Sequence, residues 1–331
     1  MKKAMTIVGI ILLVIVVIAA ALIFALSKMA AQKNEHYYEY SNPTGELEKK
    51  YTAMGDLEVS YKEYSTSDDT IKKFAIWYPT ELENSGKKYP VVVWANGTGS
   101  KSETYQYFLT HLASWGFVAV GNDDENTRTG DSLEATIQFL ISENENKDSV
   151  FYHKIDLDNI GIGGHSQGGP AVFNMVANHE HGYMIKTVYA VSATSSYHTG
   201  VFGDGWEYDI SKINVPVFLT AGTGSFDAGT ATSKMQESDE KAGVMQGICP
   251  LWSLEENFAL LPDSIDKAYV RKTGVDHGDS HLQFDGYMTA WFRYYLMGDE
   301  EAGNVFYGED AELISNQNYQ DVRIQERQAQ E

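Results

Sequence analysis

Positions 164–168, which read Gly-His-Ser-Gln-Gly, place a serine hydroxyl between two glycines. The apolar run 160–163 precedes them, and a proline and the largely apolar residues 171–177 follow, which predicts a strand, a tight turn at Ser166 and a helix. A serine at such a turn adopts a strained backbone that projects its hydroxyl, and the glycines keep side chains out of the crossing strand and helix. We therefore predict that Ser166 is a nucleophile, and we interpret the neighbouring His165 as a packing residue.

A serine nucleophile needs a base that takes its proton and a carboxylate that orients the base. His277 and His281 lie in the glycine-containing loop after the last predicted parallel strand, and the turn spacing favours His277 as the base, with His281 as the alternative. Asp227 is the only carboxylate in the loop after the preceding predicted strand, and we predict that it is the acid. Glu237 and Asp239, in a predicted helix farther on, are the other candidates for that role.

Two backbone N–H groups must face the oxygen that becomes negative during attack on a carbonyl. Gln167 directly follows the nucleophile at the predicted start of a helix, so we predict that its N–H is one donor. Thr98 follows the predicted strand 89–95, and Gly97 before it leaves room for the substrate oxygen. We predict Thr98 as the second donor of this oxyanion hole.

The loop that carries the candidate base has a competing interpretation as a metal site. Asp276, His277, Asp279 and His281 are ligand types that many metals accept. One short loop seldom completes a metal site, and we find no second cluster in the sequence. We therefore predict neither a metal nor a cofactor.

The segments that must position these residues alternate between apolar strands and amphipathic helices, which is typical of a mostly parallel sheet flanked by helices. The candidate side chains follow strand ends, where the loops of parallel strands meet. The fold class is therefore α/β. We predict strands at 57–64, 72–78, 89–95, 117–120, 160–163, 187–191, 215–221 and 267–271, and helices at 105–115, 132–142, 171–177 and 287–296.

Residues 4–27 form an uncharged, mostly aliphatic run. About 20 such residues span a bilayer as a helix, and the run exceeds the apolar core of a cleaved signal peptide. Lys2 and Lys3 before it favour a cytoplasmic N-terminus. We predict an N-terminal transmembrane helix in a single-pass protein of the cell membrane, with the catalytic domain outside the cytoplasm. Because positions 25–27 are an acceptable cleavage site, a secreted protein is the alternative.

The predicted organisation follows from these features. We assign residues 1–27 to the membrane anchor or signal sequence, 28–55 to a stalk or linker, 56–308 to the catalytic domain, and 309–331 to a polar C-terminal tail that we expect to be loose from Gln317 onward. An edge strand is the alternative for the second half of the stalk.

Charge and cysteine content exclude nucleic acid as a partner and a disulfide within the chain. The formal net charge of the 331-residue chain is −21, so it has no basic surface for the phosphates of nucleic acid. Its single cysteine, Cys249, excludes an intrachain disulfide and is followed by a proline within an apolar stretch, which favours a buried thiol.

Together these motifs resemble the α/β-hydrolases, in particular the polyester hydrolases of the cutinase and PET-hydrolase type and the dienelactone hydrolases. The resemblance covers about residues 89–308 and is carried by positions 91–98, 126–132, 155–169, 215–219, 274–277 and 290–295. It implies an α/β-hydrolase fold with Ser166 as nucleophile, Asp227 as acid and His277 as base. It also implies Thr98 and Gln167 as the oxyanion donors.

Departures from that family bear on the substrate. Thr98 stands where the polyester hydrolases have an aromatic residue, and Ala193-Thr194 stands where they have a clamping tryptophan. The C-terminal disulfide of the family cannot form. An insertion at 243–261, with Cys249, Trp252 and Phe258, is a candidate lid over the pocket.

We therefore expect a serine carboxylic-ester hydrolase that forms an acyl-enzyme, with a small-molecule or polymeric ester as substrate and the membrane as a partner of the N-terminal helix. Specific activity on polyesters does not follow. An acyltransferase or peptidase with the same triad, and a non-catalytic surface-binding module on the same fold, are the alternatives.

Overall fold

The computed structural model describes residues 28, 38, 41–203, 205–235 and 243–327. Residues 1–42 and 43–331 form separate compact units. The predicted membrane anchor at 1–27 lies outside the described residues, as do Glu237 and Asp239. Within the described ranges, no helix combines the length and the apolar character that a membrane span requires.

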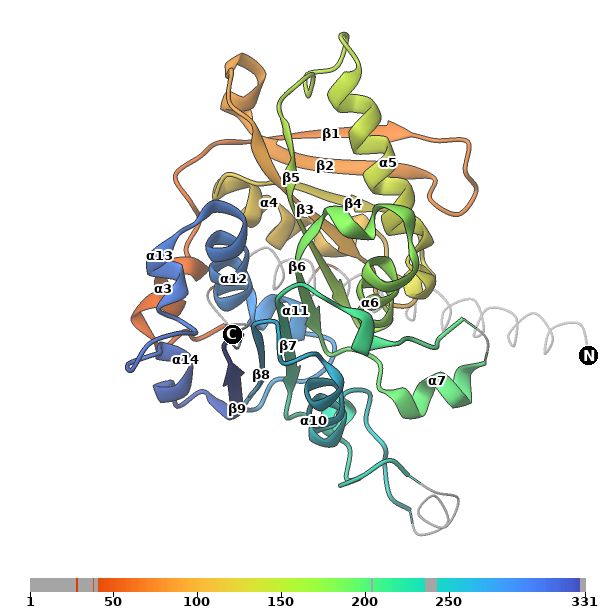
Figure 1. The fold of residues 1–331 in the computed structure, drawn as a ribbon, viewed down its shortest axis with the longest axis vertical. Helices are drawn as coiled ribbons and strands as arrows, with labels where there is room; N and C mark the ends of the chain where they lie inside the picture. The colour runs from red at the N-terminus through yellow and green to blue at the C-terminus, as the bar shows by residue number, and fades with distance from the viewer. Residues whose placement is uncertain (1–27, 29–37, 39–40, 204, 236–242, 328–331) are drawn as a thin grey trace, which may run out of the picture. The chain divides into compact units, whose positions relative to one another are not determined.

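One sheet runs through the second unit, and its central strands are parallel (Figure 1). Its nine strands lie in the order β1-β2-β4-β3-β5-β6-β7-β8-β9, with antiparallel pairing between β1 and β2, β2 and β4, and β8 and β9. The predicted α/β fold with a mostly parallel sheet is confirmed. The strands are β1 (Val59–Ser65), β2 (Lys73–Pro79), β3 (Tyr89–Ala95), β4 (Val118–Asn122), β5 (Ile155–His165), β6 (Ile185–Val191), β7 (Val217–Gly222), β8 (Lys267–Lys272) and β9 (Tyr319–Gln325).

Helices cover both faces of the sheet, because alternate side chains of the central strands point to opposite sides. On one face Val91 and Val93 join a buried cluster with α5 (Asp131–Glu145), α6 (Gly168–Asn178) and α10 (Leu251–Leu260). On the other face, Trp94 packs against Phe108 of α4 (Gln106–Ser114), with ring centroids 4.5 Å apart. Phe292 of α12 (Asp285–Met297) covers the same face beside Gly163.

Shorter helical segments connect these layers and surround the carboxyl ends of the strands. The α-helical ones are α3 (Glu46–Thr52), α7 (Ser196–Phe202), α8 (Ser225–Ala228), α11 (Ser280–Gln283), α13 (Glu300–Gly303) and α14 (Glu312–Ser315). The 3-10 turns are η1 (Thr80–Asn84), η2 (Ser102–Tyr105), η3 (Thr127–Thr129), η4 (Glu180–Met184) and η5 (Ile210–Lys212).

The stalk predicted for residues 28–55 differs from the structure in its second half, which forms neither a linker nor an edge strand. Helix α3 belongs to the second unit and packs against α12. The carboxylate of Glu312 accepts hydrogen bonds from the N–H groups of Leu47 and Glu48, at 2.7 and 2.8 Å, and so satisfies donors at the start of α3. Glu48 in turn forms a buried ion pair with Lys272 of β8, at 3.0 Å.

The prediction of a loose C-terminal tail was wrong for part of its length. Residues 319–325 form β9 and pair antiparallel with β8 at the edge of the sheet.

The insertion at 243–261, which we considered as a lid over the pocket, belongs for most of its length to the core of the domain. Leu254 and Phe258 of α10 are buried in the core cluster, and Cys249 is buried as predicted.

Candidate active site

The turn between β5 and α6 has the strained backbone that the sequence predicts. Ser166 has φ of 58°, in the left-handed region that non-glycine residues seldom adopt. A Cβ added at Gly164 would lie 2.1 Å from the carbonyl oxygen of Gly168, and a Cβ at Gly168 would lie 2.3 Å from that of Ala95. Both glycines are therefore needed for the strand and helix to approach each other, and the turn exposes the Ser166 hydroxyl.

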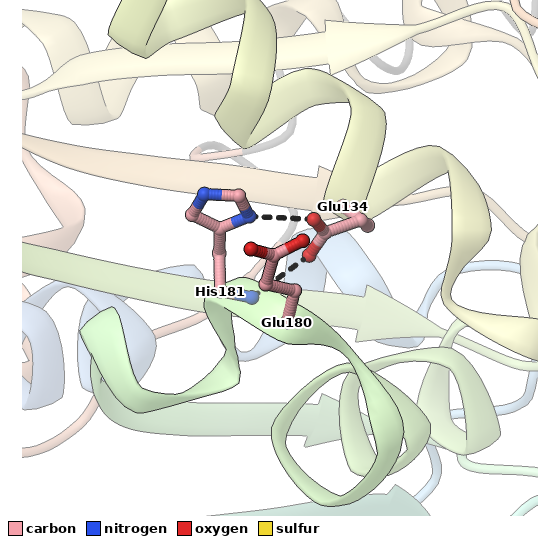
Figure 2. A group of neighbouring side chains, drawn as sticks. All are labelled: Glu134, Glu180 and His181. Carbon is pink, nitrogen blue, oxygen red and sulfur yellow. Dashed lines mark hydrogen bonds and ion pairs between the residues drawn. The ribbon is translucent and has the colours of Figure 1, made fainter.

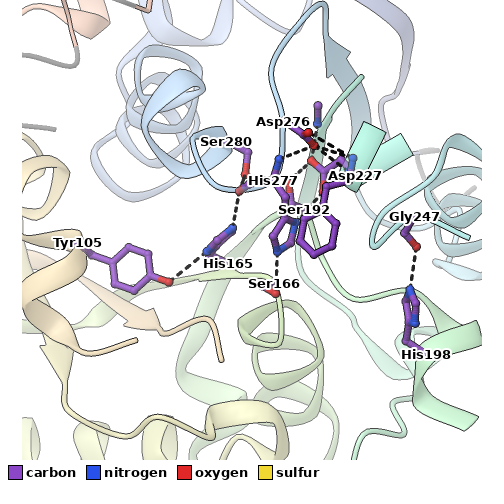
Figure 3. A network of polar contacts seen from close by, with 12 residues as sticks. Tyr105, His165, Ser166, Ser192, His198, Asp227, Gly247, Asp276, His277 and Ser280 are labelled. Carbon is purple, nitrogen blue, oxygen red and sulfur yellow. Dashed lines mark hydrogen bonds and ion pairs between the residues drawn. The ribbon is translucent and has the colours of Figure 1, made fainter. Parts of the chain in front are cut away.

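Three of the predicted residues meet at the carboxyl edge of the sheet (Figure 3). Nε2 of His277 lies 3.0 Å from Oγ of Ser166. Nδ1 of His277 lies 2.7 Å from Oδ1 of Asp227. Because the carboxylate accepts the Nδ1 hydrogen, the neutral imidazole presents a lone pair at Nε2 to the serine hydroxyl.

Asp227 is fully buried in the first turn of α8, and each of its oxygens has a donor. Oδ2 accepts hydrogen bonds from the hydroxyl of Ser192 at 2.5 Å and from the N–H of Gly222 at 2.9 Å, which leaves Oδ1 to His277. Ser192 is itself at a positive φ of 49°, at the end of β6. No sequence pattern distinguishes Ser192, because its partner is 35 residues away.

Asp276 joins the loop of the acid to the loop of the base. Its Oδ1 accepts hydrogen bonds from the N–H groups of Phe226, Asp227 and His277, at 3.0, 2.9 and 2.9 Å. Partial burial raises the pKa of Asp276, but the hydrogen bonds from these N–H groups lower it more, and the net pKa is below the usual range. The sequence singled out Asp276 only as a possible metal ligand, yet the structure uses its carboxylate to hold two loops in register.

Both residues predicted to supply the oxyanion donors lie near Ser166. Gln167 directly follows the nucleophile as the N-terminal flanking residue of α6, and Thr98 lines the cleft in front of Ser166. A Cβ at Gly97 would lie 3.5 Å from Cβ of Ser166, so this loop approaches the nucleophile closely. Within the described part of the chain, neither the Thr98 nor the Gln167 N–H donates to another backbone group.

The alternative base, His281, is not brought to the serine. It is 5% exposed, and its ring centroid lies 5.0 Å from that of His165 and 5.1 Å from that of Tyr105. Burial lowers the pKa of His281 to about 4. His165, which we interpreted as packing, hydrogen-bonds to Tyr105 and to the backbone of His277.

The cleft in front of Ser166 has a volume of about 300 Å³ and mostly apolar walls. Phe202 of α7, Trp206 and Phe226 supply aromatic rings, and Ile248 is the residue of the 243–261 insertion that reaches it. The Trp206 ring lies 5.0 Å from that of Phe202, and the guanidinium of Arg128 lies over it at 5.4 Å. Sequence reasoning did not assign these rings to the site, because no local pattern marks them.

The described residues contain one group with the composition of a metal site, formed by Glu134, Glu180 and His181 (Figure 2). None of the three lines the cleft. The carboxylate of Glu134 already accepts from Nδ1 and the N–H of His181 and from the side chain of Gln138. These contacts tie α5 to η4 through Glu134 and His181.

Comparison with known families matches residues 32–199 to the family described as PETase, PET hydrolase-like. The matched segment contains the elbow with Ser166 and both predicted oxyanion donors, and it ends before Asp227 and His277. A comparison with curated proteins found no match.

Proposed function

The chain belongs to the PET hydrolase-like family, and we propose that it is a serine hydrolase of carboxylic esters that works through Ser166, His277 and Asp227. Ester hydrolysis is the activity that the family implies. The observation that carries the assignment of residues is the hydrogen-bonded series from Ser166 Oγ to His277 Nε2, at 3.0 Å, and from Nδ1 to Asp227, at 2.7 Å.

The proposed reaction has two steps. The Ser166 proton passes to Nε2 of His277 as Oγ attacks the ester carbonyl, and the N–H groups of Thr98 and Gln167 stabilise the oxygen that becomes negative. Collapse breaks the bond to the alcohol, which leaves with the proton from His277, and the acyl group stays on Ser166. Water then attacks the acyl-enzyme and gives a proton to His277. The bond between the acyl carbon and Ser166 Oγ breaks, Oγ takes the proton back from His277, and the carboxylic acid is released.

The walls of the cleft favour a neutral, apolar substrate. Phe202 and Phe226 are 50% and 56% exposed and stand at the cleft, so the site is an open trough rather than an enclosed pocket. We propose that these rings and Trp206 contact the acyl or alcohol portion of the ester. Small and polymeric esters both fit an open site of this kind.

The serine assignment is tested by Ser166→Ala with p-nitrophenyl butyrate as substrate. We expect kcat/KM to fall by about 10⁴-fold or more, because both steps pass through Oγ. Ser253→Ala is the matched control, since Ser253 is a buried serine of α10 whose hydroxyl has no partner in the described structure. Residual activity within tenfold of the unmodified protein would exclude Ser166 as the nucleophile.

A fluorophosphonate probe separates a hydrolase from a binding module, because only a reactive serine is phosphonylated. We expect intact-protein mass spectrometry to show one adduct, absent from Ser166→Ala.

Placement of the catalytic domain outside the cytoplasm is a separate proposal that rests on residues 4–27 of the sequence. A membrane-impermeant form of the probe, applied to intact cells, should label the protein if this placement is right and fail to label it if the domain is cytoplasmic.

A further inference from the structure

A buried series of hydrogen bonds joins the loop of the proposed oxyanion hole to the loop of the proposed base, and Figure 3 shows the part of it that runs from Tyr105 through His165 to the loop of His277. The Gly97 N–H lies 2.7 Å from the hydroxyl of Tyr105, and that hydroxyl lies 3.1 Å from Nδ1 of His165. Nε2 of His165 lies 3.0 Å from the carbonyl oxygen of His277. Tyr105 is fully buried and His165 is 8% exposed, so water has little access to the series.

The chemistry of the two ends fixes the direction of every hydrogen bond. The carbonyl of His277 can only accept, so Nε2 of His165 carries a hydrogen. Burial, together with the nearby His281 and His277, holds the pKa of His165 well below its usual value, so the ring is neutral and Nδ1 accepts. The Tyr105 hydroxyl therefore donates to Nδ1, and its oxygen accepts from the Gly97 N–H.

The first bond of the series determines which N–H groups remain for a substrate. Because the Tyr105 hydroxyl accepts the Gly97 N–H, that group is directed into the protein, and the N–H of the next residue, Thr98, is left at the cleft.

The last hydrogen bond of the series, from His165 to the His277 carbonyl, helps to fix the backbone of the base. The carbonyl of His277 is held by His165 and by the hydroxyl of Ser280, at 3.0 Å each, while its N–H is held by Asp276.

We propose that Tyr105 and His165 are positioning residues, which hold the Thr98 N–H and the His277 imidazole in one fixed geometry around Ser166. This inference rests on the proposed function. Neither side chain needs to touch the reacting atoms of the substrate. Their effect is exerted through Gly97 and through the backbone of His277.

The first test is Tyr105→Phe, which removes the central hydroxyl and keeps the ring. A misplaced oxyanion donor costs transition-state stabilisation more than substrate binding, so we expect kcat for p-nitrophenyl butyrate to fall about tenfold to hundredfold with little change in KM. Tyr189→Phe is the matched control. Tyr189 is equally buried, and its hydroxyl contacts Thr220 outside the series.

The second test separates hydrogen bonding from packing at position 165. The amide of glutamine can accept with its oxygen and donate with its nitrogen, as the two ring nitrogens of His165 do, whereas leucine can do neither. We expect His165→Leu to lose kcat as Tyr105→Phe does, and His165→Gln to retain most of it. This pair also decides the question if Tyr105→Phe does not fold.

Two results would overturn the proposal. One is a kcat of Tyr105→Phe equal to that of Tyr189→Phe, and the other is an equal loss in His165→Leu and His165→Gln. A failure of the proposed function looks different, because the unmodified protein would then lack activity or Ser166→Ala would retain it. An active, Ser166-dependent enzyme with unaffected Tyr105→Phe would contradict the positioning role alone.

Discussion

At the scale of single residues, backbone constraints rather than side-chain contacts alone place the candidate triad. Ser166 and Ser192 both have positive φ values, at the ends of adjacent strands β5 and β6. Such conformations cost about 1–3 kcal/mol each and persist where surrounding structure enforces them. Asp276 contributes to that enforcement, because one carboxylate oxygen collects N–H groups from both the acid loop and the base loop.

The substitution Asp276→Asn tests that contribution through the pH dependence of the free energy of unfolding. The amide oxygen can still accept these hydrogen bonds, but the charge is lost, so we expect the free energy of unfolding at pH 7 to fall by about 1–2 kcal/mol. The folded-state pKa of Asp276 is lowered. Its stabilising contribution is therefore complete above the unfolded pKa of about 4 and disappears as the pH falls through the folded value.

Urea unfolding of Asp276→Asn and of the unmodified protein, measured at pH 7 and at successively lower pH below 4, gives the comparison. The two free energies of unfolding should converge as the pH falls. A gap of constant size across that range would show that the carboxylate charge of Asp276 does not stabilise the loops.

At the scale of elements, the sequence predicted β3, β4, β6, β7 and β8 within about two residues of their ends because they are largely apolar runs. For example, β3 spans Tyr89–Ala95, as predicted, and α5 covers the predicted 132–142 helix with a few more residues. Strand β5 begins at Ile155, well before the predicted 160–163, because its first half includes polar residues such as Asp156 and Asp158 that carry no apolar signal. The candidate acid Asp227 and base His277 could also be located in the sequence, because each lies in the loop after a predicted strand. Burial on both faces of a sheet leaves a local signal in composition, and these elements carry it.

Helix α3 and strand β9 were missed for a shared physical reason. An isolated helix of seven residues is too short to be stable in water, and an edge strand with polar residues resembles a loose tail. Both are held instead by contacts between distant residues. Tyr105 and Ser192 were missed at the site for the same reason, because the side chains with which they hydrogen-bond, His165 and Asp227, lie 60 and 35 residues away in the sequence.

The buried carboxylate of Glu48 is the centre of the contacts that hold α3 to β8 and β9. It pairs with Lys272 of β8 and accepts hydrogen bonds from Tyr319 of β9 and Asn316. Burial raises the pKa of Glu48, but these partners, Lys272 foremost, lower it more, so the carboxylate is charged at neutral pH. Helix α3 is thus tied electrostatically to the far edge of the sheet.

Glu48→Ala should destabilise the protein by about 3–5 kcal/mol, because Lys272 loses its carboxylate partner in a buried site. Glu48→Gln keeps the size and the hydrogen-bonding oxygen and isolates the effect of charge. Chemical unfolding of the three proteins gives the values. A loss below about 1 kcal/mol for Glu48→Ala, as expected for an exposed ion pair, would mean that α3 is not anchored through this carboxylate.

At the scale of the whole molecule, a strongly acidic protein surrounds an uncharged cleft. The chain has 46 acidic and 25 basic residues, whereas the described residues that line the cleft include neither kind. Two effects should therefore act against an ester that carries a free carboxylate. The net negative potential repels it at long range, and transfer of the carboxylate to apolar walls removes its hydration without supplying a cation.

A pair of matched substrates separates the two effects: p-nitrophenyl hexanoate and the p-nitrophenyl monoester of adipic acid, which differ by a terminal carboxylate. At about 10 mM ionic strength the Debye length is about 30 Å, and we expect kcat/KM for the monoester to be at least about tenfold lower. At about 1 M salt, where the Debye length is about 3 Å, the long-range part is screened and the ratio should narrow several-fold. The remaining preference then measures desolvation in the cleft. Equal kcat/KM values at low salt would show that a cation serves the carboxylate at the site, for example the Arg128 guanidinium, which lies over the Trp206 ring. A ratio that salt does not change would assign the whole preference to the cleft walls.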